Sequence, residues 1–392
     1  MKKSLGIIMF VLFTIFLGFG IIIPIMPEVI ADSGASTFHM SLMLAVYSAA
    51  SFLMSPLWGG LSDRIGRRPI IMTGLLGFSV SFLLFGLAGD NLVLMYASRI
   101  LGGLFSGAAT ACAVAYVADV TSEEKRTKGM GLVGMSIGLG FIFGPAIGGL
   151  LHPLGNAVPF FVASALSLLT LLFALRALPE SLTAEQRNRP REAGISRWAA
   201  FAGSLKYLYV LSFFVTFTLA GMEAMLQFFE MQRFGATPTD MGVMFLVSGI
   251  VGAAIQGGVV RRMVKPGDEP RVIQIGLIFS ACGFFALAFS TNLLTATVYL
   301  SIFAIGNALI RPCVTSLITQ KTSVGQGVAT GLNSSMDSLG RIAGPLAGGA
   351  VFAIRPDLPF WMGGILCLAA ILLVIRFILL DQRMEETYGA AS

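Results

Sequence analysis

The sequence predicts an all-α membrane protein with twelve transmembrane helices in two pseudo-symmetric six-helix bundles, and three observations support this. Of the 392 residues, 56% are hydrophobic and 12% are charged, a ratio well above the roughly two to one of an ordinary soluble domain. The apolar residues form runs of about 20, the length that crosses ~30 Å of hydrocarbon. The third observation is an internal repeat that relates the two halves of the chain.

Twelve apolar stretches are long enough to be membrane spans. Their approximate limits are 5–27, 38–60, 70–89, 92–117, 129–151, 157–178, 205–229, 239–260, 272–290, 294–319, 325–351 and 358–380. Lys2 and Lys3 precede the first run, as in a secretory signal. That run is too long for a signal and further spans follow it, so we expect a retained first helix.

The basic residues predict the orientation of the chain. With both termini inside, the inner segments hold 21 of the 26 basic residues, whereas the outer segments hold only Arg233 and Arg355. This bias follows the positive-inside rule and predicts cytoplasmic termini. The net charge of +6 therefore reflects topology and contact with anionic membrane lipid, and no nucleic-acid partner is expected.

Cysteine and histidine usage gives little basis for metal binding or catalysis. The four cysteines all fall within spans and show no paired spacing: Cys112, Cys282, Cys313 and Cys367. The two histidines, His39 and His152, lie at outer helix ends. We therefore expect no disulfide framework, no metal site, no cofactor and no enzymatic activity.

The longest polar stretch divides the spans six and six, and a shift of 200 residues reveals a repeat. Gly131-Leu132, Leu139-Gly140, Ile142, Gly144-Pro145 and Gly148-Gly149 recur as Gly331-Leu332, Leu339-Gly340, Ile342, Gly344-Pro345 and Gly348-Gly349. The predicted organisation is a bundle over 1–178, a cytoplasmic linker over 179–204 and a second bundle over 205–392. Two related bundles predict a pseudo-two-fold axis and a site at their interface, which is a transporter's architecture.

The loop after the second span runs from Gly59 to Ile71 as GGLSDRIGRRPII. Gly59 and Gly66 allow close backbone approach and a tight turn, and Asp63 can face a helix N-terminus. The basic residues at the inner surface are Arg64, Arg67 and Arg68. An ordinary basic turn would explain the arginines alone. The whole string resembles the signature loop of the major facilitator superfamily, G-x-L-x-D-R-x-G-R-R, and implies that family's fold.

The fifth span carries a second motif. Its members are Gly131, Gly140, Gly144, Pro145, Gly148 and Gly149. The glycines let this span approach a neighbour closely, and the proline kinks it. Close packing alone is the alternative interpretation. The pattern resembles the antiporter motif of drug/proton exporters, and this resemblance implies export rather than import.

Three other elements extend or depart from the resemblance. Residues 17–27 are similar to the L-G-x-G-x-x-x-P-x-x-P element of twelve-span drug exporters. Arg99 matches the family's R-x-x-Q-G motif, but Gly102 replaces its glutamine. Asp119 resembles the acid that such transporters pair with the signature-loop arginines, although an unpartnered helix-end charge is the alternative. In the second half the loop is degenerate, with Arg261 where the acid is expected.

Five ionisable residues lie well within spans: Arg99, Glu223, Arg311, Asp337 and Arg341. Each would cost ~3 kcal/mol near the centre of a lipid-facing helix, so they are predicted to face the bundle interior or an aqueous cavity. Asp337 and Arg341 are four positions apart and can pair on one helix face, which gives Asp337 a purely structural alternative.

Glu223 has no cation at helical spacing in its own span. A carboxylate without a fixed partner in an apolar cavity is stabilised by binding a proton, as proton exchange requires. Glu223 also resembles an acid in the seventh span of Gram-positive fluoroquinolone-type exporters. We predict it as the main proton site, followed by Asp337, with Arg99 and Arg341 also in proton coupling.

Residues near these charges are predicted to line the substrate cavity, where aromatic and thioether side chains can repack around varied ligands. They are Phe19, Asn307, Arg311, Gln227, Phe228, Asn333 and Met336. Lipid-facing filler is the alternative for any single phenylalanine. Glu28, Glu230 and Asp240 are expected to be solvated charges at the outer rim.

The expected function is proton-coupled export of small amphipathic, often cationic drugs by alternating access. The expected setting is the bacterial plasma membrane, with a multi-pass monomer that contacts lipid. A narrow exporter of a sugar, siderophore or metabolite is the alternative within the fold. A non-transporting membrane receptor or assembly factor is the alternative from another class.

Overall fold

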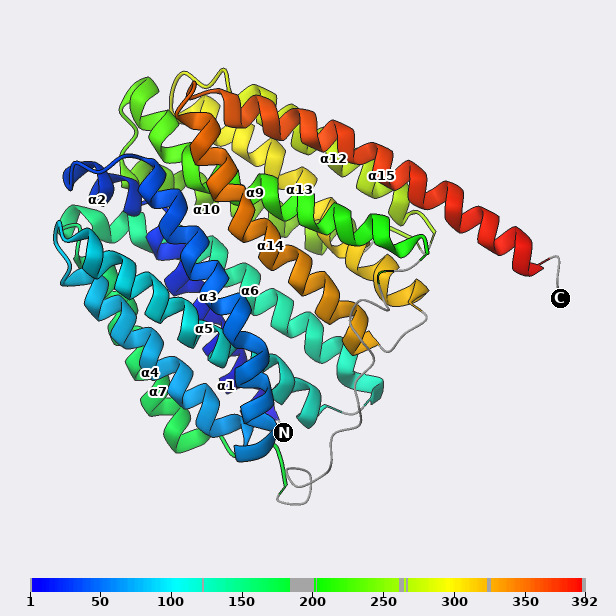
Figure 1. Cartoon of the computed structure of the whole chain (residues 1–392), viewed down its shortest axis with the longest axis horizontal. Coiled ribbons are helices and arrows are strands. Elements are labelled where there is room, and N and C mark those ends of the chain that lie inside the picture. The colour runs from blue at the N-terminus through cyan, green and yellow to red at the C-terminus, as the bar shows by residue number, and fades with distance from the viewer. Residues whose placement is uncertain are drawn as a thin grey trace. The chain divides into compact units, whose positions relative to one another are not determined.

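The computed structural model describes residues 2–121, 123–183, 201, 203–260, 264–265, 267–322 and 326–389. Contacts divide the chain into two compact units, Met1–Arg191 with Thr237–Leu246, and Glu192–Ala236 with Val247–Ser392. Within the described residues every regular element is a helix (Figure 1). The prediction of an all-helical chain is therefore confirmed.

In its described residues the first unit has seven α-helices and one 3₁₀ turn, apart from the part of α10 that it shares. They are α1 (Lys2–Ile22), α2 (Met26–Asp32), α3 (Phe38–Ile65), α4 (Arg67–Gly86), α5 (Leu92–Val120), α6 (Glu123–Leu151), η1 (His152–Leu154) and α7 (Val158–Ala177). Helix α1 packs on α6 and α7, and α4 packs on α5 and α7. Asn91 begins α5, because its side chain accepts a hydrogen bond from the Leu94 amide at 3.1 Å.

The second unit repeats this set of pairings. Its helices are α9 (Leu205–Phe234), α10 (Pro238–Ala254), the π-helical turn η3 (Ile255–Val260), α12 (Glu269–Leu287), α13 (Leu293–Lys321), α14 (Gln326–Phe352) and α15 (Leu358–Gly389). Helix α9 packs on α14 and α15, and α12 packs on α13 and α15. The first ten residues of the α10 region, Thr237–Leu246, belong by contacts to the first unit.

Eleven helices in the described part of the chain are long and apolar enough to cross a membrane. Helix α14 corresponds to the remaining predicted span and has 27 residues, about 40 Å of helix. Its described residues are less apolar than those of the other spans because they include polar and charged side chains: Asn333, Ser334, Ser335, Asp337, Ser338 and Arg341.

Two predicted features fall outside the described residues. Residues 184–200 make up most of the predicted linker, and Arg261 and Arg262 belong to the degenerate second-half loop. The linker boundaries and the role of that loop therefore stay predictions.

Candidate functional site

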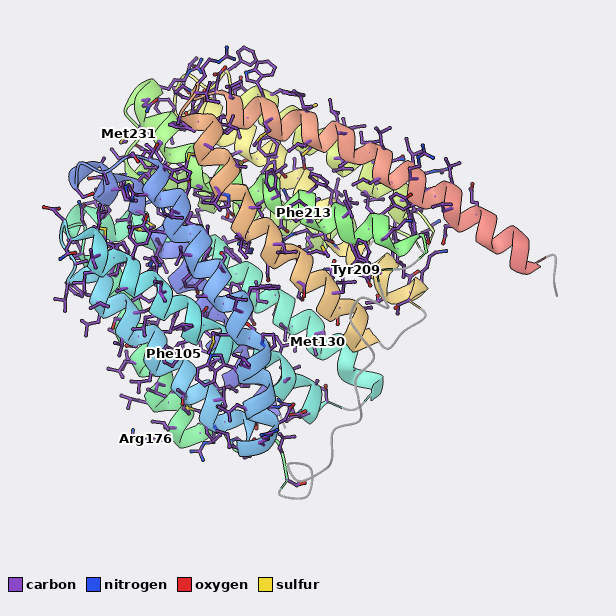
Figure 2. All side chains as sticks on the ribbon, in the orientation of Figure 1. Phe105, Met130, Arg176, Tyr209, Phe213 and Met231 are labelled. Atoms are coloured by element: carbon purple, nitrogen blue, oxygen red, sulfur yellow. The ribbon has the colours of Figure 1, made fainter. Side chains whose placement is uncertain are left out.

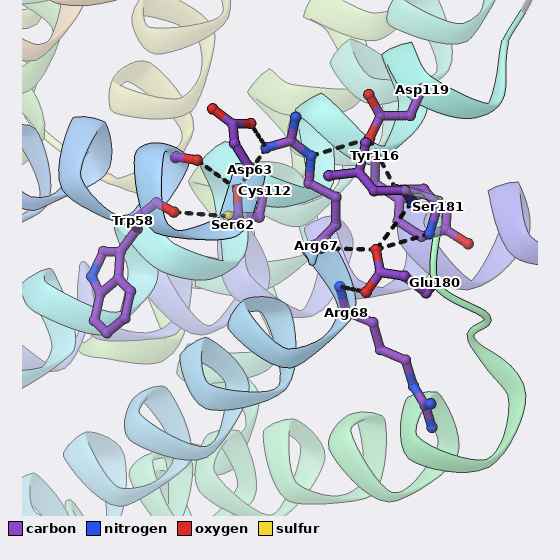
Figure 3. Close-up of polar contacts among 12 residues, drawn as sticks. Trp58, Ser62, Asp63, Arg67, Arg68, Cys112, Tyr116, Asp119, Glu180 and Ser181 are labelled. Atoms are coloured by element: carbon purple, nitrogen blue, oxygen red, sulfur yellow. Dashed lines mark hydrogen bonds and ion pairs between the residues drawn. The ribbon is translucent and has the colours of Figure 1, made fainter. Parts of the chain in front are cut away.

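The turn between α3 and α4 holds a cluster of charged residues centred on Arg67 (Figure 3). Gly66 has φ +110°, a conformation that favours glycine. It is the single residue between the end of α3 and the start of α4. The Arg67 guanidinium contacts Asp63 at 2.6 Å and Asp119 at 3.1 Å. The geometry therefore places Asp119 beside a signature-loop arginine.

Glu180 completes this cluster, although the sequence reasoning did not single it out. Its two carboxylate oxygens accept hydrogen bonds from the backbone amides of Arg67 and Arg68 at 2.9 and 3.0 Å. It therefore caps the N-terminus of α4, where anions are favoured by the helix dipole. The available signal was an acid directly after Pro179, at the start of the polar stretch.

The other predicted residues of this loop have simpler surroundings. Arg68 donates through Nη2 to the Leu175 carbonyl at 2.6 Å, and Arg64 is exposed. A Cβ added to Gly59 would meet nothing within 4 Å. The close backbone approach expected at Gly59 is therefore not observed, and the tight turn belongs to Gly66.

The predicted antiporter motif lies along the contact between α6 and α1. A Cβ at Gly140 would lie 2.7 Å from the Cβ of Phe16, and one at Gly144 would lie 2.6 Å from the carbonyl oxygen of Leu17. One at Gly148 would lie 2.5 Å from a backbone oxygen of α1. These three glycines thus allow the two helices to pack backbone against backbone.

The remaining motif positions differ in their surroundings. The ring of Pro145 packs against Gly20 of α1. A Cβ added to Gly20 would lie 2.8 Å from the Cδ atom of Pro145. Gly149 contacts the segment 238–242 of the same unit, and its carbonyl accepts a hydrogen bond from Thr239 at 2.8 Å. A Cβ at Gly131 would meet nothing within 4 Å, so close packing does not explain that glycine.

In the second unit, α9 and α14 repeat this close contact. A Cβ at Gly340 would lie 2.8 Å from the carbonyl oxygen of Phe213, which is labelled in Figure 2. One at Gly344 would lie 2.3 Å from the carbonyl oxygen of Phe217. The two helices therefore touch through their backbones, which brings the polar residues on each into range of one another.

Three of the predicted site residues meet at this contact. Thr216 donates a hydrogen bond to Asp337 Oδ1 at 2.7 Å and accepts one from Arg311 Nη2 at 3.1 Å. One turn away, Ser212 donates to Asn333 Oδ1 at 2.6 Å. The Thr216 hydroxyl thus links an acid of α14 to a cation of α13.

Thr216 on α9 is a partner of Asp337 that the sequence did not point to. The pairing with Arg341, the structural alternative for Asp337, stays a prediction. Sequence reasoning missed Ser212 and Thr216. The available signal was their spacing of four residues, which places both on one face of the seventh span with Glu223.

Glu223 lies two turns further along α9 and is partly exposed. Among the described residues it makes no hydrogen bond or ion pair, and the charges acting on it are those of Arg341 and Arg311. The structure therefore brings the predicted proton site, Glu223, and two of the three intramembrane arginines within electrostatic range.

The predicted cavity residues of this unit are more buried than expected. Gln227 is 1% exposed, and neither atom of its amide has a hydrogen-bond partner in the described part of the chain. The Asn307 Oδ1 atom is likewise buried without a partner there. Phe228 is buried against Phe352, with ring centroids 6.3 Å apart, and Met336 is also buried.

Arg99 and Phe19 come together in the first unit around Tyr47. Arg99 is 2% exposed, with its guanidinium carbon 4.6 Å from the centroid of Phe85 and 5.9 Å from that of Tyr47. Phe19 packs on the same tyrosine with centroids 5.3 Å apart. Within the described residues Arg99 Nε has no hydrogen-bond partner, and Nη2 donates to Ser98 Oγ at 3.4 Å. Aromatic rings provide the rest of its surroundings. Tyr47 was not predicted.

Comparisons with known proteins agree with this architecture. The Major Facilitator Superfamily model matches residues 8–325 and 267–389. Multidrug resistance protein 2 of Bacillus subtilis is 34% identical over 93% of this chain and 94% of its own. The quinolone resistance protein NorA of Staphylococcus aureus is 28% identical over 96% of each chain.

Solved structures of transporters superpose on nearly the whole chain. The human organic anion transporter MFSD10 superposes with a TM-score of 0.73 and 26% identity, and covers 95% of this chain and 99% of its own. A POT family transporter in complex with 5-aminolevulinic acid shares the fold, with a TM-score of 0.76, 14% identity and 96% of each chain covered.

Proposed function

Because the chain belongs to the major facilitator superfamily, we propose that it exports amphipathic, often cationic drugs across the bacterial plasma membrane in exchange for protons. The relatives named for multidrug and quinolone resistance support the substrate class, since they match over nearly the whole chain. The predicted orientation places both termini in the cytoplasm, and we propose a monomer embedded in lipid.

The observation that carries this proposal is the environment of Glu223. It has no hydrogen-bond or ion-pair partner among the described residues, yet the charges of Arg311 and Arg341 act on it. A carboxylate of this kind can take up a proton or interact with a cationic drug without first breaking a fixed pair. Asp337, which is held by Thr216, is the second proton site of the proposal.

In the proposed cycle the two bundles rock about a site near the membrane midplane. A proton from outside neutralises Glu223 or Asp337 and displaces the drug outward. The empty protein then returns and releases the proton to the cytoplasm. One proton entering down 100 mV supplies ~2.3 kcal/mol, enough for a roughly fiftyfold gradient of a neutral drug.

A monovalent cation that leaves in exchange for one proton moves no net charge. Only the pH gradient would then drive its export. The charge of the substrate therefore decides how strongly export depends on the membrane potential.

The test uses inside-out vesicles with an acidic lumen and a fluorescent pH probe. Addition of a drug is expected to evoke proton release from the lumen, and Glu223→Gln is expected to abolish it, because the amide cannot carry the proton. Asp90→Asn is the matched control, since Asp90 is an exposed acid in the α4–α5 turn. Unchanged release in Glu223→Gln would overturn the role of Glu223. No response to a broad drug panel would favour a narrow metabolite exporter.

A further inference from the structure

Glu230, near the C-terminal end of α9, is not the solvated rim charge that its position suggested. The residue is 0% exposed, as is Ser290, which lies in the turn between α12 and α13. The Ser290 hydroxyl oxygen lies 2.9 Å from both carboxylate oxygens of Glu230. A buried carboxylate with a single hydroxyl partner needs a further explanation, because burying an unpaired charge is costly.

The cation that acts on Glu230 does not form an ion pair with it. Arg233 acts electrostatically on Glu230 but makes no ion pair with it within 4 Å. Instead, its Nη1 donates to the Ala288 carbonyl at 2.7 Å, and its guanidinium lies over the Phe229 ring at 5.3 Å. The turn between α12 and α13 contributes a serine and a carbonyl group, and no charged side chain from it acts on Glu230 in the described part of the chain.

Counting hydrogens shows how this site holds a proton. The Ser290 hydroxyl has one hydrogen, yet it lies 2.9 Å from the Leu287 carbonyl as well as from the two Glu230 oxygens. When Glu230 is protonated, its O–H donates to the Ser290 oxygen while the Ser290 O–H donates to Leu287. Every donor then has an acceptor. When Glu230 is ionised, the single serine hydrogen must serve either the carboxylate or the carbonyl.

Glu230 is also aligned with the main proton site. Glu223, Gln227 and Glu230 occupy positions i, i+4 and i+7 and so lie on one face of α9. The two acids are about 10 Å apart along the helix axis, too far for direct proton transfer, and Gln227 lies between them. Its amide is buried and has no hydrogen-bond partner among the described residues, so both its donor and its acceptor are available to a passing water molecule.

We propose that Glu230 is the outer proton-receiving group of the transporter and that it supplies Glu223 through water bound at Gln227. The inference rests on the proposed function and extends it to the route that the proton follows. Glu230 takes a proton from the outside and transfers it to water. That water delivers a proton to the Glu223 carboxylate, so that one O–H bond breaks and one forms at each step and no other reactant is consumed.

Drug-evoked proton release and drug counterflow in the same vesicles test the proposal. Counterflow exchanges labelled for unlabelled drug without net proton movement, so it reports folding and drug binding. Glu230→Gln is expected to slow proton release at least about tenfold, as expected for the loss of a proton-transfer group, while counterflow stays at the wild-type rate. Gln227→Leu is expected to slow proton release as well, whatever its effect on counterflow, since Gln227 is also a predicted cavity residue. Glu230→Asp is expected to restore part of the rate.

Four outcomes separate this proposal from the one on which it rests. Asp90→Asn should behave as wild type, because that acid is exposed and lies outside α9. No drug-evoked release in the wild type would overturn the proposed function and the relay with it. Release at the wild-type rate in Glu230→Gln would overturn the relay alone. Loss of counterflow in Glu230→Gln would assign Glu230 to packing and also overturn the relay.

Discussion

The α1–α6 contact in the first unit and the α9–α14 contact in the second share one backbone geometry. Gly144 packs on the carbonyl of Leu17, and Gly344 packs on the carbonyl of Phe217. A shift of 200 residues relates Gly144 to Gly344 and Leu17 to Phe217. The glycines therefore maintain the same helix contact in both copies of the repeat, whatever side chains surround them.

The side chains along these two contacts differ. Thr216 and Asp337, which are hydrogen-bonded in the second unit, correspond by the same shift to Phe16 and Ile137 in the first. Phe16 packs its ring on Phe141, with centroids 5.3 Å apart, where the second unit has Arg341. The duplicated contact is thus apolar in one copy and polar in the other, so the close helix contact does not depend on which side chains surround it.

The largest expected effect comes from replacing the glycines that maintain both helix contacts. Gly144→Ala and Gly344→Ala each place a Cβ less than 3 Å from a backbone oxygen, and rigid backbone cannot move aside cheaply. We expect each substitution to lower the free energy of unfolding by ~1–3 kcal/mol, the usual range for overpacking. Denaturant titration in detergent micelles would measure the two losses side by side.

Gly131→Ala is the matched control for these substitutions, because a Cβ there meets nothing within 4 Å. Replacing an open helical glycine by alanine is expected to raise stability by ~0.5–1 kcal/mol. A loss at Gly131 equal to that at Gly144 would show that a contact outside the chain, such as lipid, rather than the α1–α6 contact, governs the motif.

The next effect concerns the polar side chains that the α9–α14 contact has and the α1–α6 contact lacks. Thr216→Val keeps the shape of the side chain and removes the hydroxyl that links Arg311 to Asp337. We expect loss of drug-evoked proton release together with a stability loss of ~1–2 kcal/mol, because two half-buried polar groups lose a partner. Thr216→Ser keeps the hydroxyl and should retain release. If Thr216→Val released protons at the wild-type rate, the hydroxyl bridge would have no part in coupling.

Much of this comparison could be predicted from the sequence, because it depends on local patterns. Glycine spacing predicted a close contact for the fifth span, and the shift of 200 predicted its copy. The partner helix did not follow from spacing, since α1 and α9 lie far from α6 and α14 in the chain. The hydrogen bond from Thr216 of α9 to Asp337 could likewise not be predicted, because it joins two helices that are distant in sequence.

Burial was the harder property to predict. Glu230 lies one turn from a helix end, which suggested a solvated charge, yet a turn between two other helices covers it. Glu180 has no motif of its own, and its role depends on the tertiary position of the α4 N-terminus. Both residues make contacts between segments that are distant in sequence, and a single sequence does not encode such distances directly.

A smaller effect is expected at the charged turn of the first unit. Glu180→Gln keeps one carbonyl acceptor for the α4 amides and removes the negative charge from the helix N-terminus. The expected stability loss is ~1 kcal/mol, the sum of a weakened cap and a lost dipole interaction. Thermal melting in detergent at low and high salt measures it, and the loss should shrink in high salt. A loss that does not change with salt would point to packing instead of charge.

The smallest effect again compares the two copies, at the first turns of α5 and α13. Asn91 accepts one hydrogen bond from the Leu94 amide, whereas Asn292 and Thr295 form a reciprocal capping box. Asn91→Ala and Asn292→Ala each remove one side-chain acceptor and are each expected to cost ~0.5–1 kcal/mol, whereas Thr295→Val removes the acceptor of the Asn292 backbone amide and is expected to cost ~0.5 kcal/mol. Denaturant titration of these variants and of the double variant Asn292→Ala/Thr295→Val measures the losses. Because each bond of the box joins one side chain to one backbone amide, the two losses at α13 are expected to add. No loss in Thr295→Val would mean that the box adds nothing beyond a single cap.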